Sequence, residues 1–315
     1  MKNIVRIFVW VAALALMGIS CDHKDLCYDH RHTTVRVEFD WAEAPEASPA
    51  GMCVLFYPAG GGAPVVKEFE GKEGGSVDIP DGAYDVVCYN ADASNVSYRD
   101  VESLDALEAC VREGSVMEGL DGGLAAPPLA DDGETVVAAP GRLWSCRVDG
   151  VELVPDGQGV DNVVVLTPRS VTRRVVWEVS PVTGSGNLRA VRAVLSGMSA
   201  SLRLGACEPG SSLVSMPSAG EVDGGDPEKL TGSFECFGCP GGTTCRHILT
   251  LYCWSDYGNV MASWDVTDQV HAAAADGDIH IVVTVTGGIT IPDEDSGSFD
   301  PGVDGWDDRF SDIIM

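Results

Sequence analysis

The chain has 315 residues, which favours two domains of about 100 to 150 residues each over a single small domain. Its 48 acidic residues outnumber its 20 basic residues, and the resulting formal charge of −28 excludes ordinary nucleic-acid binding and argues against electrostatic docking on an anionic membrane. The 37 glycines and 17 prolines indicate many turns and few long helices, so we expect a strand-rich globular protein.

The first 20 residues have the layout of a secretory signal peptide. Two basic residues, Lys2 and Arg6, precede an apolar run over residues 7–17. A transmembrane helix needs about 20 apolar residues, so this run is too short to span a bilayer. We therefore expect export of the chain and removal of residues 1–20.

Cys21 is the candidate lipid-attachment residue. Two small residues, Gly18 and Ser20, come shortly before it, as in the lipobox of bacterial lipoproteins. The acyl chains of such a cysteine form a durable anchor, at about 0.8 kcal/mol for each buried CH₂. The alternative is plain cleavage of the signal peptide, which leaves Cys21 as a free or disulfide-bonded thiol. Residues 21–33 are polar and predict a tether between the anchor and the fold.

Alternating patterns predict an antiparallel β-sandwich over residues 34–169. From Thr34 to Trp41 apolar and polar residues alternate, which is typical of a strand with one face in water. The segment Ser103–Arg112 instead has apolar residues at helical spacing and a serine that can cap a helix. Residues 113–141 predict a loop. The other expected strands of this half lie at 52–57, 65–69, 76–79, 84–90, 142–148, 150–154 and 160–166.

A second sandwich is predicted over residues 170–288. We expect a long polar loop at 208–230 and a second short helix over Asp265–Ala275. With about seven strands in each half, the fold class is all-β with two short helices, in two tandem immunoglobulin-like antiparallel sandwiches. The expected strands of this half lie at 175–179, 188–204 with an interruption at Gly197, 233–237, 247–254, 260–264 and 279–285.

Residues 289–315 form an acidic tail. Pro292 and several glycines argue against regular structure there, and we expect Trp306 to dock on a domain surface. The spacing Asp293-x-Asp295-x-Gly297 departs from the EF-hand pattern and lacks its final glutamate. Loose calcium binding by the tail is therefore an open alternative.

Ten cysteines follow Cys21, and an even number in an exported chain permits disulfides whose connectivity the sequence does not give. The most closely spaced cysteines along the chain are Cys236, Cys239, Cys245 and Cys253. This cluster is a weak candidate for a tetrahedral zinc site, with His247 as an alternative ligand. Because the second pair of cysteines lacks the CxxC spacing, we prefer disulfides or plain thiols to a metal.

The other histidines give weaker signals. In the tether, His30 and His32 are spaced so that both rings lie on one side of an extended chain, which makes them a weak metal candidate. A solvated tether is the preferred interpretation. For His271 and His280, near the last helix and strand, we expect surface roles.

Three aromatic residues lie near one predicted hairpin and are weak candidates for a sugar-binding platform: Trp254, Tyr257 and Trp264. Core packing is the preferred interpretation for two of them. The chain contains no GxSxG, HExxH, Walker or dinucleotide motif, and its many carboxylates single out no catalytic pair. We therefore expect no cofactor and no enzyme activity.

Three stretches of the chain carry a family resemblance. The first holds Cys27-Tyr28-Asp29-His30-x-His32 and Val35-x-Val37-x-Phe39-Asp40-Trp41-x-x-Ala44-Pro45. The second holds Gly51-Met52-x-Val54-x-Phe56-Tyr57-Pro58 and Ile79-Pro80-x-Gly82-x-Tyr84-Asp85. The third holds Trp264-Asp265-Val266-Thr267-Asp268-Gln269-Val270, Ile279-His280-Ile281 and Val303-Asp304-x-Trp306. Together they resemble an uncharacterised, fimbrillin-related lipoprotein family of Bacteroidales.

This resemblance implies two tandem transthyretin-like sandwiches and a relation to fimbrial subunits or their anchors. Polymerising relatives exchange a β-strand with a neighbouring subunit, but no donor position can be carried onto this chain. The acidic tail is one candidate donor, although Pro292 and Pro301 make it a poor full-length strand.

The expected function is that of a lipid-anchored, non-catalytic surface protein, either a fimbrial subunit or a fimbrial anchor or accessory component. We expect it in the bacterial cell envelope, at the outer membrane or in a fimbrium. Its expected partners are outer-membrane lipid, through Cys21, and other fimbrial subunits by strand exchange. The alternatives are a surface lipoprotein that binds glycans or proteins without polymerising, and a cysteine-dependent redox or metal protein.

Overall fold

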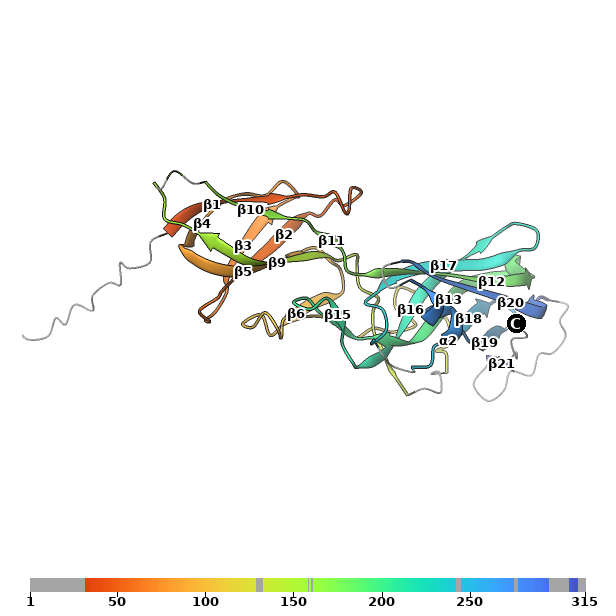
Figure 1. Cartoon of the computed structure of the whole chain (residues 1–315). Helices are drawn as coiled ribbons and strands as arrows, with labels where there is room; N and C mark the ends of the chain where they lie inside the picture. The colour runs from red at the N-terminus through yellow and green to blue at the C-terminus, as the bar shows by residue number, and fades with distance from the viewer. Residues whose placement is uncertain are drawn as a thin grey trace, which may run out of the picture.

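The computed structural model describes residues 32–128, 133–157, 159, 161–241, 245–274, 277–294 and 306–310. The predicted signal peptide, Cys21 and His30 lie outside these residues, as do Asp295 and Gly297 of the calcium candidate. Within the described ranges, no helix is both long enough and apolar enough to cross a membrane. Figure 1 shows two lobes of β-structure arranged end to end, so the predicted all-β class is confirmed.

The first lobe is a sandwich of two sheets. The smaller sheet has the strand order β10 (Asn162–Leu166), β1 (His32–Phe39) and β4 (Gly75–Pro80). The larger sheet has the order β11 (Arg169–Ser170), β9 (Trp144–Leu153), β5 (Gly82–Asn90), β2 (Gly51–Pro58) and β3 (Val65–Glu70). Val35, Val54 and Phe56 are buried between the two sheets. Their alternation along β1 and β2 is what the period-two pattern predicts.

A further sheet joins the two lobes. Its order is β15 (Glu208–Pro209), β14 (Ser201–Arg203), β7 (Glu108–Val111) and β6 (Val96–Arg99), so it takes strands from both halves of the chain. This sheet covers the outer face of β2 and β5, where Leu55 and Val87 pack against Leu107 and Leu202. The proposed domain ranges, 34–169 and 170–288, therefore share one hydrophobic cluster.

The second lobe also has two layers. One layer holds β20 (Ile279–Thr290), β12 (Arg173–Thr183) and β17 (Lys229–Cys236). The other holds β13 (Leu188–Ser199), β18 (Ile248–Ser255), β19 (Asn259–Asp265) and β21 (Trp306–Phe310). Strand β16 (Leu213–Asp223) joins them, because its first part pairs with β13 and its last residues pair with β17. The short strand β8 (Thr135–Val136) pairs with β16, and the helices are η1 (Ser185–Asn187) and α2 (Thr267–Ala272).

In each lobe the first strand pairs in parallel with the last long strand. Strand β1 is parallel to β10 in the first lobe, and β12 is parallel to β20 in the second. The expectation of purely antiparallel sandwiches is thus wrong for these pairs. Alternation along a strand shows which face is buried but not the direction of its neighbour, so the sequence pattern could not reveal them.

One of the two predicted helices is absent. Residues 103–107 form only a turn, in which the N–H of Leu107 donates to the carbonyl of Ser103, and residues 108–111 then form strand β7. Strand β7 pairs with β14, about 90 residues further along the chain. This non-local pairing overrides the helical spacing of the local sequence. The second predicted helix is confirmed as α2.

The expected polar loop at 208–230 is also wrong, because residues 213–223 form β16. Small polar residues occupy this strand because the fully buried Trp177 packs against it. A Cβ atom at Gly220 or at Gly232 of the paired strand would lie 2.7 Å or less from the indole of Trp177. The indole N–H donates to the hydroxyl of Ser218 at 3.2 Å. The strand therefore resembles a loop in composition, although its small residues are there to pack against the buried Trp177.

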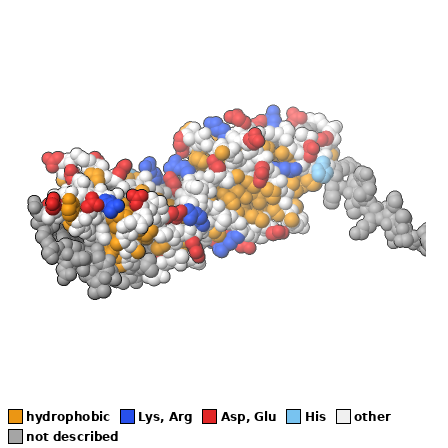
Figure 2. Space-filling view, turned by 180° about the vertical axis from the view of Figure 1, so that it is seen from behind, with side chains coloured by type: hydrophobic (Ala, Val, Ile, Leu, Met, Phe, Trp, Pro, Cys, Tyr) orange, Lys and Arg blue, Asp and Glu red, His pale blue; other side chains and the backbone are white. Residues whose placement is uncertain are grey.

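Acidic and basic side chains are scattered over the surface in Figure 2, and a hydrophobic patch lies on the lobe beside the grey amino-terminal segment. Exposed large hydrophobic side chains of this lobe include Val66, Val163 and Val165. This scattered charge is consistent with the large acidic excess of the chain.

Candidate functional site

Two of the three candidate sugar-binding aromatics are buried. Trp254 is 0% exposed and Trp264 is 2% exposed, whereas Tyr257 is 45% exposed at the turn between β18 and β19. A sugar platform requires aromatic faces open to solvent, and two of these rings have none.

A loop from the first half of the chain covers part of this aromatic surface. The indole of Trp254 donates to the carbonyl of Ala125 at 2.8 Å, and the hydroxyl of Tyr252 donates to the carbonyl of Pro128 at 3.0 Å. Trp306 completes the cluster by donating to the carbonyl of Ala126 at 3.1 Å. Residues 125–128 of the predicted loop therefore cover the outer face of β18, whereas residues 135–136 of the same segment form β8.

Strand β21 extends this sheet from the acidic tail. Residues 306–310 pair in parallel with residues 259–263 of β19. The ring of Trp306 is 7% exposed and meets Tyr252 edge to face, with centroids 5.6 Å apart. The structure thus places Trp306 on the second lobe, as expected, and adds a short strand that the sequence did not predict.

A second cluster combines histidine and cysteine side chains at the base of the β18–β19 hairpin. His247 is fully buried, and its Nδ1 lies 3.0 Å from the carbonyl oxygen of Ser196. A hydrogen on Nδ1 satisfies that carbonyl and leaves Nε2 with a lone pair directed into the cluster. Burial is the main cause that lowers the pKa of His247, so its ring is neutral at neutral pH.

Helix α2 brings a second imidazole to His247. The Nε2 atoms of His247 and His271 are 3.2 Å apart, and the two rings meet edge to face at 89°. The backbone N–H of His247 donates to the hydroxyl of Thr267, which fixes the start of α2 beside it. His271 is exposed on its outer side, so the cluster is open to solvent from the direction of α2.

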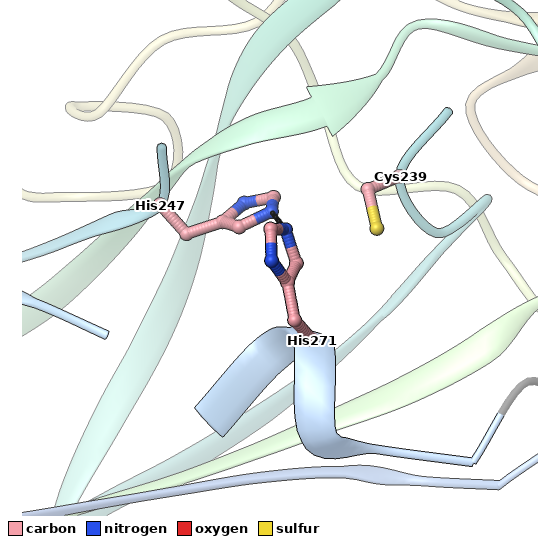
Figure 3. A group of neighbouring side chains, drawn as sticks. All are labelled: Cys239, His247 and His271. Carbon is pink, nitrogen blue, oxygen red and sulfur yellow. Dashed lines mark hydrogen bonds between the residues drawn. The ribbon is translucent and has the colours of Figure 1, made fainter. Parts of the chain in front are cut away.

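Two of the four candidate cysteines belong to this cluster. Cys239 lies with both imidazoles in a group whose ligand atoms are all within 4.8 Å of one another (Figure 3). The Sγ atom of Cys245 is 3.7 Å from Nε2 of His247. Burial raises the pKa of the Cys239 thiol; Cys245 adds to that rise and Arg173 opposes it.

The other two candidate cysteines are core residues. Cys236 and Cys253 belong to the main hydrophobic cluster of the second lobe. Burial raises the pKa of each thiol to about 12, so both remain protonated at neutral pH. The remaining candidate in the described chain, His32, is exposed at the start of β1.

His271 is exposed, as expected for a surface residue, but its Nε2 also lies 3.2 Å from Nε2 of His247, a contact that the sequence did not predict. The feature of the sequence that could have revealed this contact is the predicted β18–β19 hairpin. In the β18–β19 pair, Ile248 lies opposite Asp265, so the residue before the hairpin and the helix after it must be neighbours. The two histidines are far apart along the chain, so their spacing in the sequence alone does not indicate the contact.

Fold and site together define a two-lobed, all-β protein with a covered aromatic face and a histidine–cysteine cluster. Residues 20–218 match a family described as "Domain of unknown function (DUF5119)". The chain belongs to this family, since the match covers more than half of it.

Over 109 residues the chain is 30% identical to a Bacteroides ovatus protein named as a candidate fimbrium anchoring subunit, Fim4B. That match spans 35% of this chain and about a third (33%) of the relative. It confirms the predicted resemblance to fimbrillin-related proteins of Bacteroidales.

Solved structures share the fold. A candidate adhesin from Bacteroides ovatus has a TM-score of 0.62 at 21% identity, covering 87% of this chain and 98% of that one. The fimbrial anchor protein Mfa2 from Porphyromonas gingivalis has a TM-score of 0.45 at 14% identity, covering 80% and 89% of the two chains. The first of these similarities establishes the two-lobed fold.

Proposed function

We propose that the chain is a non-catalytic fimbrial component, acting as an anchor or accessory subunit at the bacterial surface. The observation that carries the proposal is the 30% identity over 109 residues to a candidate fimbrium anchoring subunit. The fold shared with a candidate adhesin supports it further. The rival, a glycan-binding lipoprotein, has less support because Trp254 and Trp264 are buried.

We further propose that Cys21 carries the lipid that holds the protein in the outer membrane. The family match begins at residue 20, so it includes Cys21 and leaves outside all but the last residue of the predicted signal peptide. Two or three acyl chains at about 0.8 kcal/mol for each buried CH₂ suffice for a lasting anchor.

For contact with other subunits we propose the side of β19 that β21 occupies. The chain's own β21 pairs there over five residues, and an added strand satisfies backbone N–H and C=O groups that an edge leaves open. A strand donated by a neighbouring subunit would displace β21 and occupy the same edge.

The anchoring role is tested by deleting the gene in the producing bacterium. Loss of an anchor is expected to release fimbriae into the medium, and complementation should restore them to the cell. Unchanged fimbriae on the deletion strain, together with no labelling of fimbriae by antibody against the protein, would contradict the proposal.

The lipid anchor is tested separately by metabolic labelling with palmitate. We expect Cys21→Ala to abolish labelling and to release the protein from the membrane fraction. Cys27→Ala is the matched control, because it removes a nearby thiol that follows no lipobox, and it should label normally. Equal labelling of both variants would rule out Cys21 as the site.

A further inference from the structure

The histidine–cysteine cluster gathers side chains from three separate segments. Cys239 follows β17, Cys245 and His247 precede β18, and His271 lies on α2. Their convergence on one point is therefore a property of the tertiary fold.

Two distances in the cluster match the edges of a tetrahedral zinc site. Zn–N bonds of about 2.0–2.1 Å and Zn–S bonds of about 2.3 Å imply an N···N edge of about 3.3 Å and an N···S edge of about 3.6 Å. The two Nε2 atoms are 3.2 Å apart, and the Sγ of Cys245 is 3.7 Å from Nε2 of His247. The Sγ of Cys239 and the two imidazoles form a set of three whose ligand atoms all lie within 4.8 Å of one another, and Cys245 adjoins this set through its contact with His247.

The surroundings of His247 are those of a metal ligand. Metal-binding histidines usually give the hydrogen of their other ring nitrogen to a carbonyl or carboxylate, which fixes the ring. Nδ1 of His247 meets the carbonyl of Ser196 in this way. Gly197 makes room for the ring, because a Cβ atom there would lie 2.7 Å from Nδ1.

From this geometry we propose that Cys239, His247 and His271 bind zinc in a structural site, and that Cys245, which contacts His247, turns toward the ion as the fourth ligand. Two thiolates and two neutral imidazoles suit zinc, since the thiolates cancel the charge of the ion and both ligand types are common in closed tetrahedral sites. The exposed side of His271 gives the ion a path of entry. The metal would clip α2 and the residues after β17 to the base of the β18–β19 hairpin.

The simpler alternative is a hydrogen bond between the two imidazoles, with no metal. In that case the Nε2–H of His271 donates to Nε2 of His247, and the cysteine thiols take no part in the interaction. The two interpretations differ in whether the cysteines matter, so the experiment must test a cysteine and a histidine together.

The test is performed on protein expressed from the full-length sequence and purified under reducing conditions. Elemental analysis is expected to find one zinc per chain. After chelation, titration with Co²⁺ alone should saturate at one ion per chain and give thiolate-to-cobalt charge-transfer bands with the intense visible absorption of tetrahedral coordination. X-ray absorption at the zinc edge should show two sulfur and two nitrogen ligands.

Variants assign the ligands. We expect Cys239→Ser and His271→Ala to weaken Co²⁺ binding at least about tenfold. Matched controls are Cys207→Ser and His280→Ala, which alter exposed residues outside the cluster and should bind as the parent does. Circular dichroism of each variant verifies folding, and His271 is suited to this test because its side chain is exposed.

The proposal is overturned if the reduced protein binds neither zinc nor cobalt stoichiometrically. It is also overturned if a folded Cys239→Ser protein binds cobalt with unchanged affinity and unchanged charge-transfer bands. A zinc edge fitted by oxygen ligands alone would mean surface carboxylates hold the ion, which equally contradicts the assignment.

Discussion

Trp306 packs edge to face against Trp254, with ring centroids 5.1 Å apart and ring planes at 83°. This contact fastens the acidic tail to the second lobe, because Trp306 is the first residue of β21. Both indoles also donate to carbonyls of the same covering loop. The tail strand, the loop and β18 therefore form one packed unit.

Replacing this ring is expected to release the tail strand. Trp306→Ala removes a buried indole, a change that costs about 3–5 kcal/mol where the whole contact is lost. Because β21 lies at a sheet edge, we expect this loss of stability to appear as local opening of β21. The free energy of global unfolding should change little. Hydrogen exchange should rise in residues 306–310 and along β19. Tyr257→Ala, on the same hairpin but exposed, is the control; equal exchange in the two variants would contradict this account.

Gly197 is expected to tolerate no side chain. Its φ is +77°, and a Cβ atom would lie 2.5 Å from the carbonyl oxygen of Arg246 and 2.7 Å from Nδ1 of His247. We expect Gly197→Ala to lower the free energy of unfolding by about 2–4 kcal/mol, from backbone strain and the clash together. Urea denaturation measures this change.

The matched control is Gly61→Ala. Gly61 also has a positive φ, of +82°, but no atom lies within 4 Å of its added Cβ. It should cost only about 1 kcal/mol, the backbone contribution alone. If the two variants are equally destabilised, the packing against His247 does not matter.

Asp265 is expected to stabilise the start of α2 in a pH-dependent way. Hydrogen bonds from Thr267 and Arg246 lower the pKa of its carboxyl from 3.8 to about 2. The ionised form is thus favoured in the folded state, so the stabilisation is present above about pH 4 and is lost as the pH falls toward 2. The side chain is 46% exposed, and screening by solvent limits the effect to about 0.5–1 kcal/mol.

We therefore expect Asp265→Asn to be less stable than the parent at pH 7 and to approach it near pH 2. Urea denaturation at both pH values measures the difference. Asp268→Asn removes a charge from the same helix while leaving the Thr267 contact, and its difference from the parent should not show this convergence. If Asp265→Asn lowers the free energy of unfolding by the same amount at both pH values, the ionised carboxylate is not the source of the stabilisation.

Cys88 and Cys146 are expected to form a disulfide under mild oxidation. They are directly paired between β5 and β9, with Sγ atoms 3.4 Å apart. Burial raises the pKa of Cys88, whereas the hydrogen bond from Cys88 lowers that of Cys146, so Cys146 is the thiol that ionises first. Peptide mapping after treatment with oxidised glutathione should recover the linked pair.

The bond closes a long loop, so it should raise the free energy of unfolding by about 2–4 kcal/mol. Cys88→Ala is expected to abolish both the link and the gain in stability. Cys253→Ala, in the core of the second lobe, leaves the pair intact and should still allow the link to form. Recovery of Cys88 linked to some other cysteine would show that the strand register differs.

Local patterns were enough to predict most strands of this protein, and the reason is visible in β1 and β20. Each has one face against a core and one in water, so alternation along the sequence reports burial directly. Helix α2 was predictable because its apolar residue Val270 and its polar start lie within one short segment. The all-β class and the relation to fimbrial proteins followed from such local features.

Long-range pairing decided the rest. Residues 108–111 form a strand because they pair with β6 on one side and with β14 on the other. Residues 213–223 look like a loop in the sequence because small residues there make room for Trp177. The predicted cysteine cluster likewise combined residues that are close along the chain: Cys236, Cys239, Cys245 and Cys253. The fold separated them, placing two in the core and two beside His247 and His271, because a hairpin returns the chain to its starting point. Composition determined the class and charge of this protein, while contacts between distant residues decided which of its side chains meet.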